Sequence, residues 1–357
     1  MPMNKTLTTK DVLKALSTIQ DPDLRRDIVS LGFVKDLIVE DHRVSFAIEL
    51  TTPACPVKDV LAAQARRAVE ALGARDVEVR LTSRVTSARG PAPELIPEVK
   101  NTIAVASGKG GVGKSTLAAN LAVALQRAGA KVGLMDTDVY GPSVPTIMGS
   151  AQPPTVVEGK LEPPLEHGIK LISMGYFLPR NEAVIWRGPM LHKMIQQFLG
   201  DVRWGELDYL IMDLPPGTGD IQLSLAQTIP LTGAAIVSTP QDLALSVASK
   251  AITMFHKLSV PILGIIENMS YYLCPNCGHR EEIFGHGGAR EACRQLNVPF
   301  LGEIPLDTAI RTQSDRGQPV ALDATTTYGR AFQEVAASLA AQISIANAVK
   351  QQEIKIE

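Results

Sequence analysis

The residues from Ser107 to Thr116 form the pattern with the clearest chemistry in this sequence. They contain G-x-x-x-x-G-K-S, which follows an apolar run and opens a helical one. Glycines at these spacings let backbone N–H groups turn toward one anion, and the amino end of the following helix adds its positive dipole. The pattern predicts a nucleotide phosphate-binding loop made of Gly108, Lys109, Gly110, Gly111, Val112, Gly113, Lys114, Ser115 and Thr116.

The polar side chains of this loop have distinct expected contacts. Lys114 should reach the β- and γ-phosphates, Ser115 should give its hydroxyl to Mg²⁺, and Thr116 lies close enough to contact phosphate. Lys109 adds a second cation, which is useful where negative charge builds up during phosphoryl transfer. The alternatives are a glycine-rich turn without a ligand and, for Lys109, a lysine that only faces solvent.

Acidic residues follow two other predicted strands. Asp136 and Asp138 flank Thr137 at one strand end, and Asp213 ends the apolar run that starts at Tyr209. Doubly wound sheets bind their ligands at the carboxyl ends of strands. Asp213 can hold Mg²⁺ through water, and Gly217 can bring its backbone N–H near a γ-phosphate. Each aspartate could instead be a helix cap or a turn residue.

Cys274 and Cys277 form a C-x-x-C pair in a short polar loop. One pair supplies two thiolates, whereas a Zn²⁺ or [4Fe–4S] site generally takes four ligands. Two copies of the loop that meet at the two-fold axis of a homodimer would supply four. The alternatives are a single-chain zinc site that adds His279 or His286, a redox pair, which usually opens a helix, and two ordinary loop cysteines.

Alternating strands and helices must position these residues. The predicted strands are Thr102–Ser107, Lys131–Asp136, Ile169–Ser173, Tyr209–Asp213, Ala234–Ser238, Ile262–Glu267 and Phe300–Ile304. The predicted helices are Lys114–Ala128, Pro189–Leu199, Gly219–Gln227, Asp242–Leu258, Gly287–Leu296 and Tyr328–Ala346. Short apolar strands separated by helices indicate an α/β fold with a doubly wound, mostly parallel sheet.

A second, smaller unit precedes this sheet. Small residues and prolines between 83 and 93 are typical of a linker, so we predict a small α+β domain at 1–85, a linker at 86–98 and a large domain at 99–357. The small domain should contain helices at Asp11–Ile19, after a Thr8 or Thr9 cap, and Val57–Leu72, with strands at Leu37–Val39, Val44–Leu50 and Val77–Leu81. Cys55 lies where a strand meets a helix, and the helix dipole could lower its thiol pKa; a plain buried cysteine is the alternative.

Composition excludes several classes of protein. The chain has 357 residues, of which 45% are hydrophobic and 20% charged, as in globular proteins. A net charge of -2 and 4% aromatic residues argue against nucleic-acid binding. No apolar run is long enough to span a bilayer, residues 1–10 lack a signal-peptide core, and four cysteines do not make a disulfide framework. We therefore expect a cytoplasmic protein without nucleic-acid or membrane partners.

The motifs together resemble those of the Mrp/ApbC-type iron–sulfur carrier ATPases, which are P-loop proteins of the deviant Walker A group that includes MinD, ParA and NifH. The matching segments span nearly the whole chain: GKGGVGKS at 108–115, DTDVYGPS at 136–143, WRGP at 186–189, DLPPGTGD at 213–220 and the C-x-x-C at 274–277. The small domain resembles the SufT/PaaD type through DPD at 21–23 and TTPACP at 51–56.

This resemblance implies an ATP-binding, slowly hydrolysing homodimer. It would hold a [4Fe–4S] cluster between its subunits at Cys274 and Cys277, receive it from an upstream scaffold and pass it to apo iron–sulfur proteins. The resemblance also assigns individual roles. Lys109 would reach the partner subunit's nucleotide, Lys114 would contact the phosphates, Asp138 would polarise the attacking water, Asp136 and Asp213 would support Mg²⁺, and Asn268 would contact adenine, with Pro305 and Asp307 at the same edge.

Two other functions fit parts of the pattern. A positioning ATPase of the MinD or ParA type shares the phosphate loop, but it would need a basic amphipathic tail or a basic face. The segment Val349–Glu357 is mixed in charge and has few apolar anchors. The second alternative is a non-enzymatic interaction protein that holds zinc at the C-x-x-C.

Overall fold

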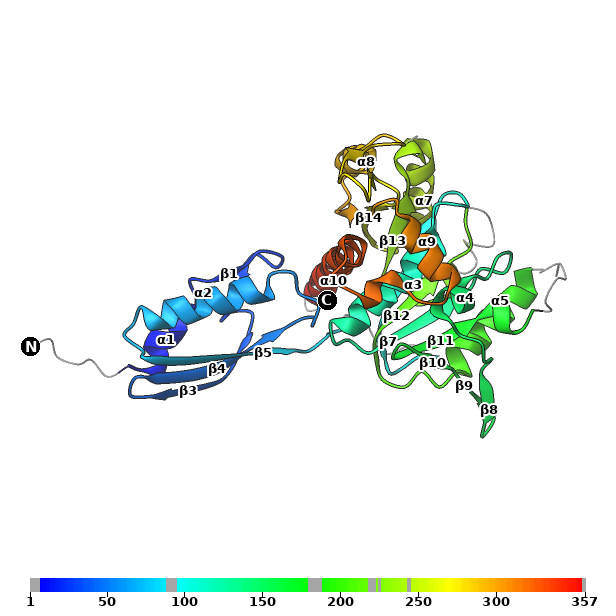
Figure 1. Ribbon diagram of the computed structural model, residues 1–357. Helices are drawn as coiled ribbons and strands as arrows, with labels where there is room; N and C mark the ends of the chain where they lie inside the picture. The colour runs from blue at the N-terminus through cyan, green and yellow to red at the C-terminus, as the bar shows by residue number, and fades with distance from the viewer. Residues whose placement is uncertain are drawn as a thin grey trace, which may run out of the picture.

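The computed structural model describes residues 7–87, 95–178, 188–217, 223, 226–242 and 245–354 (Figure 1). Two units, each built around its own sheet, make up these residues. A three-stranded sheet lies in the amino-terminal unit, and an eight-stranded sheet lies in the carboxy-terminal unit. The fold is thus α/β with a mostly parallel, doubly wound main sheet and a small α+β unit before it, which is the predicted class.

The small unit follows the predicted order of helix, strand, strand, helix and strand. Its elements are α1 (Thr9–Leu16), β3 (Val34–Glu40), β4 (Arg43–Leu50), α2 (Lys58–Glu70) and β5 (Asp76–Ser83). Strand β4 pairs antiparallel with β3 and parallel with β5. A short antiparallel pair, β1 (Gln20–Asp21) and β2 (Arg26–Asp27), was not predicted, because two residues carry no readable periodicity.

A capping box explains where α1 begins. The Thr8 hydroxyl accepts from the Asp11 N–H at 3.2 Å, and the Asp11 carboxylate accepts from the Thr8 N–H at 3.3 Å. These two bonds satisfy backbone donors that a helix start leaves without partners. Val12 and Leu16, four residues apart, are buried in the core of the small unit. The helix ends at Leu16, three residues before the predicted end at Ile19.

The main sheet contains all seven predicted strands and one more. Its members, in sequence order, are β6 (Val99–Ser107), β7 (Val132–Asp136), β10 (Leu165–Glu166), β11 (Ile169–Ser173), β12 (Leu207–Asp213), β13 (Gly233–Ser238), β14 (Ile262–Glu267) and β17 (Phe300–Glu303). In space the order is β10-β11-β7-β12-β6-β13-β14-β17, and every pair is parallel except β10 with β11. The carboxyl ends of the parallel strands therefore share one edge of the sheet.

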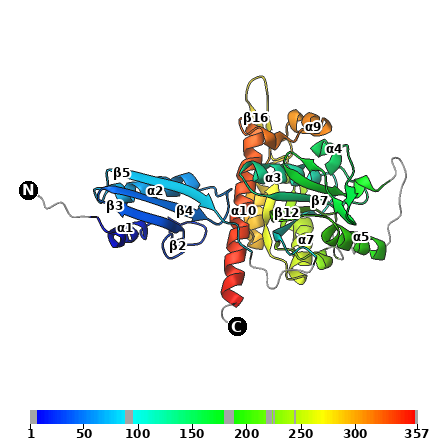
Figure 2. The same ribbon diagram turned by 90° about the horizontal axis from the view of Figure 1, so that it is seen from below.

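Helices cover both faces of this sheet (Figure 2). They are α3 (Lys114–Arg127), α4 (Val144–Met148), α5 (Gly188–Gly200), α7 (Leu245–Lys257), α8 (Gly288–Leu296), α9 (Thr308–Asp315) and α10 (Thr327–Ile354), with short 3₁₀ turns η1 (Met174–Tyr176), η2 (Pro240–Asp242) and η3 (Val320–Leu322). Alternate residues of β6 face opposite cores: Ile103 packs with α3 and α10, and Ala104 packs with α5 and α7. The predicted helix Gly219–Gln227 lies mostly outside the described residues.

Two hairpins extend from the large unit. One consists of β8 (Thr155–Val157) and β9 (Lys160–Glu162), and the other of β15 (Tyr272–Leu273) and β16 (Arg280–Glu281). The second hairpin carries the C-x-x-C in its turn and projects beyond the sheet and its helices (Figure 2). Strands of two or three residues are too short to be recognised by alternation, so neither hairpin was predicted.

The small unit contacts the amino-terminal edge of the main sheet. The Tyr209 hydroxyl, near the start of β12, donates to the Thr52 hydroxyl at 2.9 Å, and the Asn347 amide of α10 donates to the Thr86 carbonyl at 2.8 Å. Ala54 and Val85 are buried in the same core as α3 and α10. None of the helices in the described part of the chain is long and apolar enough to cross a membrane.

Candidate functional site

The loop between β6 and α3 has the backbone that phosphate binding requires. Gly111 and Gly113 have φ angles of 81° and 80°, in the left-handed region that favours glycine. A Cβ at Gly113 would also collide with the side-chain amide of Asn268. Gly113 offers no side-chain cap to α3, so the first N–H groups of the helix face the loop and can bind an anion.

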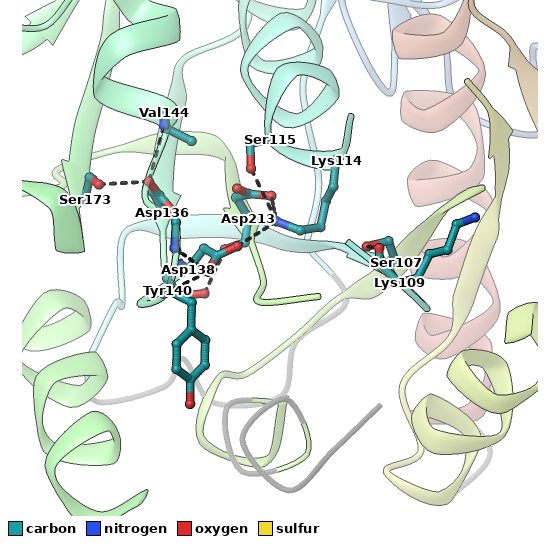
Figure 3. Close-up of polar contacts among 12 residues, drawn as sticks. Ser107, Lys109, Lys114, Ser115, Asp136, Asp138, Tyr140, Val144, Ser173 and Asp213 are labelled. Carbon is teal, nitrogen blue, oxygen red and sulfur yellow. Dashed lines mark hydrogen bonds and ion pairs between the residues drawn. The ribbon is translucent and has the colours of Figure 1, made fainter. Parts of the chain in front are cut away.

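Lys114 lies at the centre of the site (Figure 3). Its Nζ is 2.5 Å from Asp213 Oδ1, 3.4 Å from Ser115 Oγ and 3.8 Å from Asp138 Oδ2. Its side chain is 6% exposed. The lysine therefore neutralises a carboxylate that would otherwise be buried without a counter-charge.

The acidic residues at the ends of β7 and β12 crowd around this one cation. Asp136 and Asp213 are both fully buried. Burial, followed by the charge of Asp213, raises the pKa of Asp136 to about 8. Burial also raises the pKa of Asp213, although Lys114 acts in the opposite direction. Asp136 accepts hydrogen bonds from the Ser173 hydroxyl at 2.8 Å and the Asp138 N–H at 3.1 Å, which suits a supporting role.

The second carboxylate oxygen of Asp213 is the atom that best fits Mg²⁺ chemistry. Among the buried side-chain nitrogen and oxygen atoms of the described residues, Asp213 Oδ2 alone has no hydrogen-bond partner. A buried acceptor without a donor is costly, so such an atom indicates a group that binds there. The Ser115 hydroxyl lies beside the Asp213 carboxylate and 3.4 Å from Lys114 Nζ (Figure 3). Asp213 and Ser115 are therefore suited to hold Mg²⁺, one through water and one directly.

Three other predicted site residues, Asp138, Gly217 and Lys109, differ in how close they lie to the phosphate cavity. Asp138 Oδ1 accepts from the Tyr140 and Gly141 N–H groups at 3.1 and 3.2 Å, and the residue lines the phosphate cavity. The Gly217 N–H, expected near a γ-phosphate, donates to the Ser107 carbonyl at 2.9 Å in this structure. Lys109 is exposed and extends away from Lys114 and Asp213 (Figure 3).

Two adjoining cavities run along the carboxyl edge of the sheet. The first, of about 250 Å³, is lined by the phosphate loop, including Lys109, Gly110, Gly111, Gly113, Lys114, Ser115, Thr116 and Asp138. The second, of about 630 Å³, shares Gly113 and Thr116 with the first and is lined by Asn268, Pro305 and Asp307 as well. The residues that line these two cavities do not include Gly108, Val112, Asp136, Asp213 or Gly217.

The larger cavity has the shape and lining for a nucleotide base. Asn268 donates to the Val112 carbonyl at 2.7 Å, which fixes its side chain beside the phosphate loop. The apolar walls come from Ile147 on α4 and Ile310 on α9, neither of which the sequence analysis identified. Both helices are short, with five and eight residues, so their apolar periodicity is weak; the Asp307 cap of α9 was the available signal.

The cysteine pair occupies the turn of the β15–β16 hairpin. Cys274 is half-buried and Cys277 is exposed, and both are free thiols. The Cys274 N–H donates to the His279 carbonyl at 2.9 Å, which closes the turn. Hydrogen bonds from the backbone of Cys277 and Asn276, and from the Cys277 thiol, lower the pKa of Cys274. A lowered pKa favours the thiolate, which is the form that binds metal.

A zinc site within one chain finds no support in this geometry. His286 does not approach the cysteines but pairs with Glu303 at 2.8 Å. In the described residues, the one group of three potential metal ligands that converges within 4.8 Å is Glu267, His286 and Glu303, without either cysteine. The turn also does not open a helix, as a thioredoxin-like redox pair would.

Of the two alternatives for Cys55, the structure favours a plain buried cysteine. Cys55 is 9% exposed, and burial raises the pKa of its thiol instead of lowering it. The backbone N–H of Val57 acts in the opposite direction but does not compensate. Cys293 is buried in the core, and burial raises its thiol pKa to about 11.

Comparison with protein families matches both units. Residues 98–340 match the model described as NUBPL iron-transfer P-loop NTPase, and residues 9–81 match the model described as iron–sulfur cluster assembly protein. A protein of Deinococcus radiodurans named iron–sulfur cluster carrier protein is 49% identical over 338 residues, which cover 94% of this chain and 95% of the relative.

Solved structures give the same picture of the large unit. A nucleotide-binding protein from Archaeoglobus fulgidus in complex with ADP is 46% identical, with a TM-score of 0.57 over 62% of this chain and 88% of that one. The cell-division ATPase MinD of Pyrococcus furiosus is 23% identical, with a TM-score of 0.51 over 67% of this chain and 97% of that one, and it supports the fold alone.

Proposed function

The chain belongs to the NUBPL iron-transfer P-loop NTPase family, and from that premise we propose that it carries a [4Fe–4S] cluster to apo iron–sulfur proteins while it binds and slowly hydrolyses ATP. The name of the Deinococcus radiodurans relative supports the cargo, and the second family match, over residues 9–81, supports a role in cluster assembly. The phosphate loop and the base cavity support the nucleotide.

The observation that carries this proposal is the thiol pair on its projecting hairpin. Cys274 has a lowered pKa, Cys277 is exposed, and no histidine of the same chain joins them within the described residues. A [4Fe–4S] cluster takes four thiolates, so one chain provides half of a site. Two copies related by a two-fold axis complete it, and we infer a homodimer with the cluster between the subunits.

The nucleotide site has the groups for ATP hydrolysis. Lys114 would contact the β- and γ-phosphates, and Asp213 and Ser115 would hold Mg²⁺. Mg²⁺ neutralises phosphate charge when bound. Asp138 lines the phosphate cavity, where its Oδ2 can polarise the attacking water. Lys109 is exposed and extends away from Lys114 (Figure 3), and we infer that it reaches the nucleotide of the partner subunit.

The cellular setting follows from the cargo and the thiols. All four cysteines are free, which suits a reducing compartment, and we assign the protein to the cytoplasm. Its partners are then a second copy of the chain, an upstream scaffold that supplies the cluster, and recipient apoproteins. We assign it no nucleic-acid or membrane partner.

The test is anaerobic reconstitution of the full chain with iron and sulfide. Wild-type protein should gain cluster absorbance with equal iron and sulfide contents, and should elute as a dimer. The double variant C274A/C277A should lose the absorbance but bind ATP with unchanged affinity, since the phosphate loop is intact.

The control variant is Cys293→Ala, which removes a buried thiol on α8 that the proposal does not use. It should keep its cluster. Cluster absorbance retained in the double variant would overturn the assignment of the ligands. Stoichiometric zinc in place of iron and sulfide, in protein purified anaerobically, would overturn the assignment of the cargo.

A further inference from the structure

A set of charged side chains lies at the base of the cysteine hairpin. Glu303 ends β17, and its carboxylate accepts from His286 Nε2 at 2.8 Å and lies 3.2 Å from the oxygen of the Ser270 hydroxyl. Its other oxygen lies 3.5 Å from a guanidinium nitrogen of Arg280, the first residue of β16. Glu303 thus joins the last strand of the main sheet to the returning strand of the hairpin.

This contact matters because the hairpin has little structure of its own. Its two strands have two residues each and pair at two positions, and an isolated two-stranded hairpin is marginally stable at best. The Arg280 guanidinium lies 3.9 Å from the centre of the Tyr271 ring, so it also bridges the two sides of the hairpin. Arg280 and Glu303 therefore fix the direction in which the turn with the two cysteines points.

The same base is connected to the nucleotide cavity. Asn268 and Leu306 both line the cavity for the base, and the Leu306 N–H donates to the Tyr271 carbonyl at 2.7 Å. Asn268 itself lies six residues before Cys274 on one continuous segment. A nucleotide that moves either wall of this cavity therefore acts directly on the base of the hairpin.

The cluster of Glu267, His286 and Glu303 is held together by protein donors. The buried Glu267 carboxylate accepts from the Ser270 hydroxyl at 2.6 Å and the Ala289 N–H at 2.8 Å. Two other charged groups lie near this cluster. Arg280 contacts Glu303 directly, and the Glu282 carboxylate lies 3.6 Å from Nδ1 of His286. Because these carboxylates already accept hydrogen bonds from protein donors, the cluster is suited to a structural role rather than to binding a cation.

We propose that Glu303 is a positioning residue, which through Arg280 holds the cysteine hairpin in register with the nucleotide cavity and transmits nucleotide binding to the two thiols. The proposal rests on the proposed function, since it concerns the same thiol pair. It adds Glu303 and Arg280 as the residues through which the nucleotide cavity acts on the thiol pair. Two sites joined in this way influence each other reciprocally.

The experiment measures thiol accessibility, so it does not depend on a bound cluster. The alkylation rates of Cys274 and Cys277 in the full-length apoprotein are followed by mass spectrometry, with and without a non-hydrolysable ATP analogue and Mg²⁺. In wild-type protein the analogue should change these rates by about fivefold or more. In Glu303→Gln the thiols should react faster without nucleotide, and the analogue should still bind but no longer change their rates.

Two further variants make the result specific. Arg280→Lys keeps the charge but loses the planar stacking on Tyr271, so it should show an intermediate response even if Glu303→Gln folds poorly. Glu291→Gln breaks the exposed Arg294–Glu291 pair (3.1 Å) on α8 and should respond like wild type. A wild-type response in both Glu303→Gln and Arg280→Lys overturns the proposal, as does a wild-type protein whose thiols ignore the nucleotide. Neither outcome bears on whether reconstituted wild-type protein holds iron and sulfide, which tests the proposed function separately.

Discussion

Three buried or nearly buried aspartates share one lysine at the nucleotide site. Lys114 contacts Asp213 directly and Asp138 at 3.8 Å, whereas Asp136 relies on hydrogen bonds from neutral donors. Removing charges from water is expensive, and one cation cannot offset three anions. The raised pKa values of Asp136 and Asp213 are the consequence, and they make this site sensitive to pH.

Asp136→Asn should therefore change how stability depends on pH. Because the pKa of Asp136 rises from 3.8 to about 8, the folded chain binds a proton that the unfolded chain releases between these values. The contribution of this proton is complete below the lower value and lost above the higher one, so wild-type stability should fall as pH rises. Asparagine does not titrate. As pH rises, the unfolding free energy of the wild-type protein should therefore fall relative to that of the variant, by up to about 1.4 kcal/mol per pH unit.

The measurement is urea unfolding of both proteins, without nucleotide, from pH 5 to pH 9. Comparing the two curves cancels the titration of all other groups that behave alike in both proteins. Curves that stay parallel over the whole range would contradict the raised pKa of Asp136.

At the scale of elements, the two short helices beside the base cavity meet through a pair of glycines. Gly149 follows α4 and Gly317 lies just after α9, with φ angles of 71° and 69°. A Cβ on Gly317 would collide with the Gly149 backbone. These helices supply Ile147 and Ile310 to opposite parts of the cavity lining, so the glycine contact sets how closely the walls approach.

Gly317→Ala should push α4 and α9 apart. We expect a loss of about 1–3 kcal/mol in unfolding free energy and weaker ATP binding, since strain and a backbone clash act together. Thermal unfolding and a nucleotide titration measure the two effects. Gly159→Ala is the matched control, because Gly159 has a φ of 76° but no atom within 4 Å of its Cβ position. If the control weakens ATP binding as much as Gly317→Ala, the contact is not the cause.

The long, periodic elements were predictable and the short ones were not. The phosphate loop, the parallel strands and α3 follow from glycine spacing and apolar runs, and the structure brings Lys114, Asp138 and Asp213 together as expected. Elements α4, α9, β15 and β16 have between two and eight residues, so the sequence carries too few turns or alternations to reveal them. The walls of the base cavity and the hairpin contacts of Glu303 were missed for this reason.

The sign of the Cys55 pKa shift shows a different limit. Its position between a strand and α2 suggested activation by the helix dipole, but the shift depends on what buries the thiol. The burial comes from the core of the small unit, whose residues lie far apart in sequence. Tertiary burial of this kind outweighs a local dipole, and no local pattern reports it.

At the scale of the whole molecule, one buried hydroxyl pair joins the two units. Tyr209→Phe removes the donor of the Tyr209–Thr52 bond and should lower the unfolding free energy by about 1 kcal/mol. ATP affinity should not change, because Tyr209 lies near the opposite end of β12 from Asp213. A double-mutant cycle with Thr52→Val measures the bond itself, and additive effects would mean that the hydroxyls do not interact in solution.

The position of the small unit also determines how far it lies from the phosphate loop. Helix α3 has 14 residues and is about 21 Å long. It runs from the phosphate loop to Arg127, and this second end lies beside Cys55 of the small unit. A partner that binds at the small unit would therefore lie about one helix length from the nucleotide.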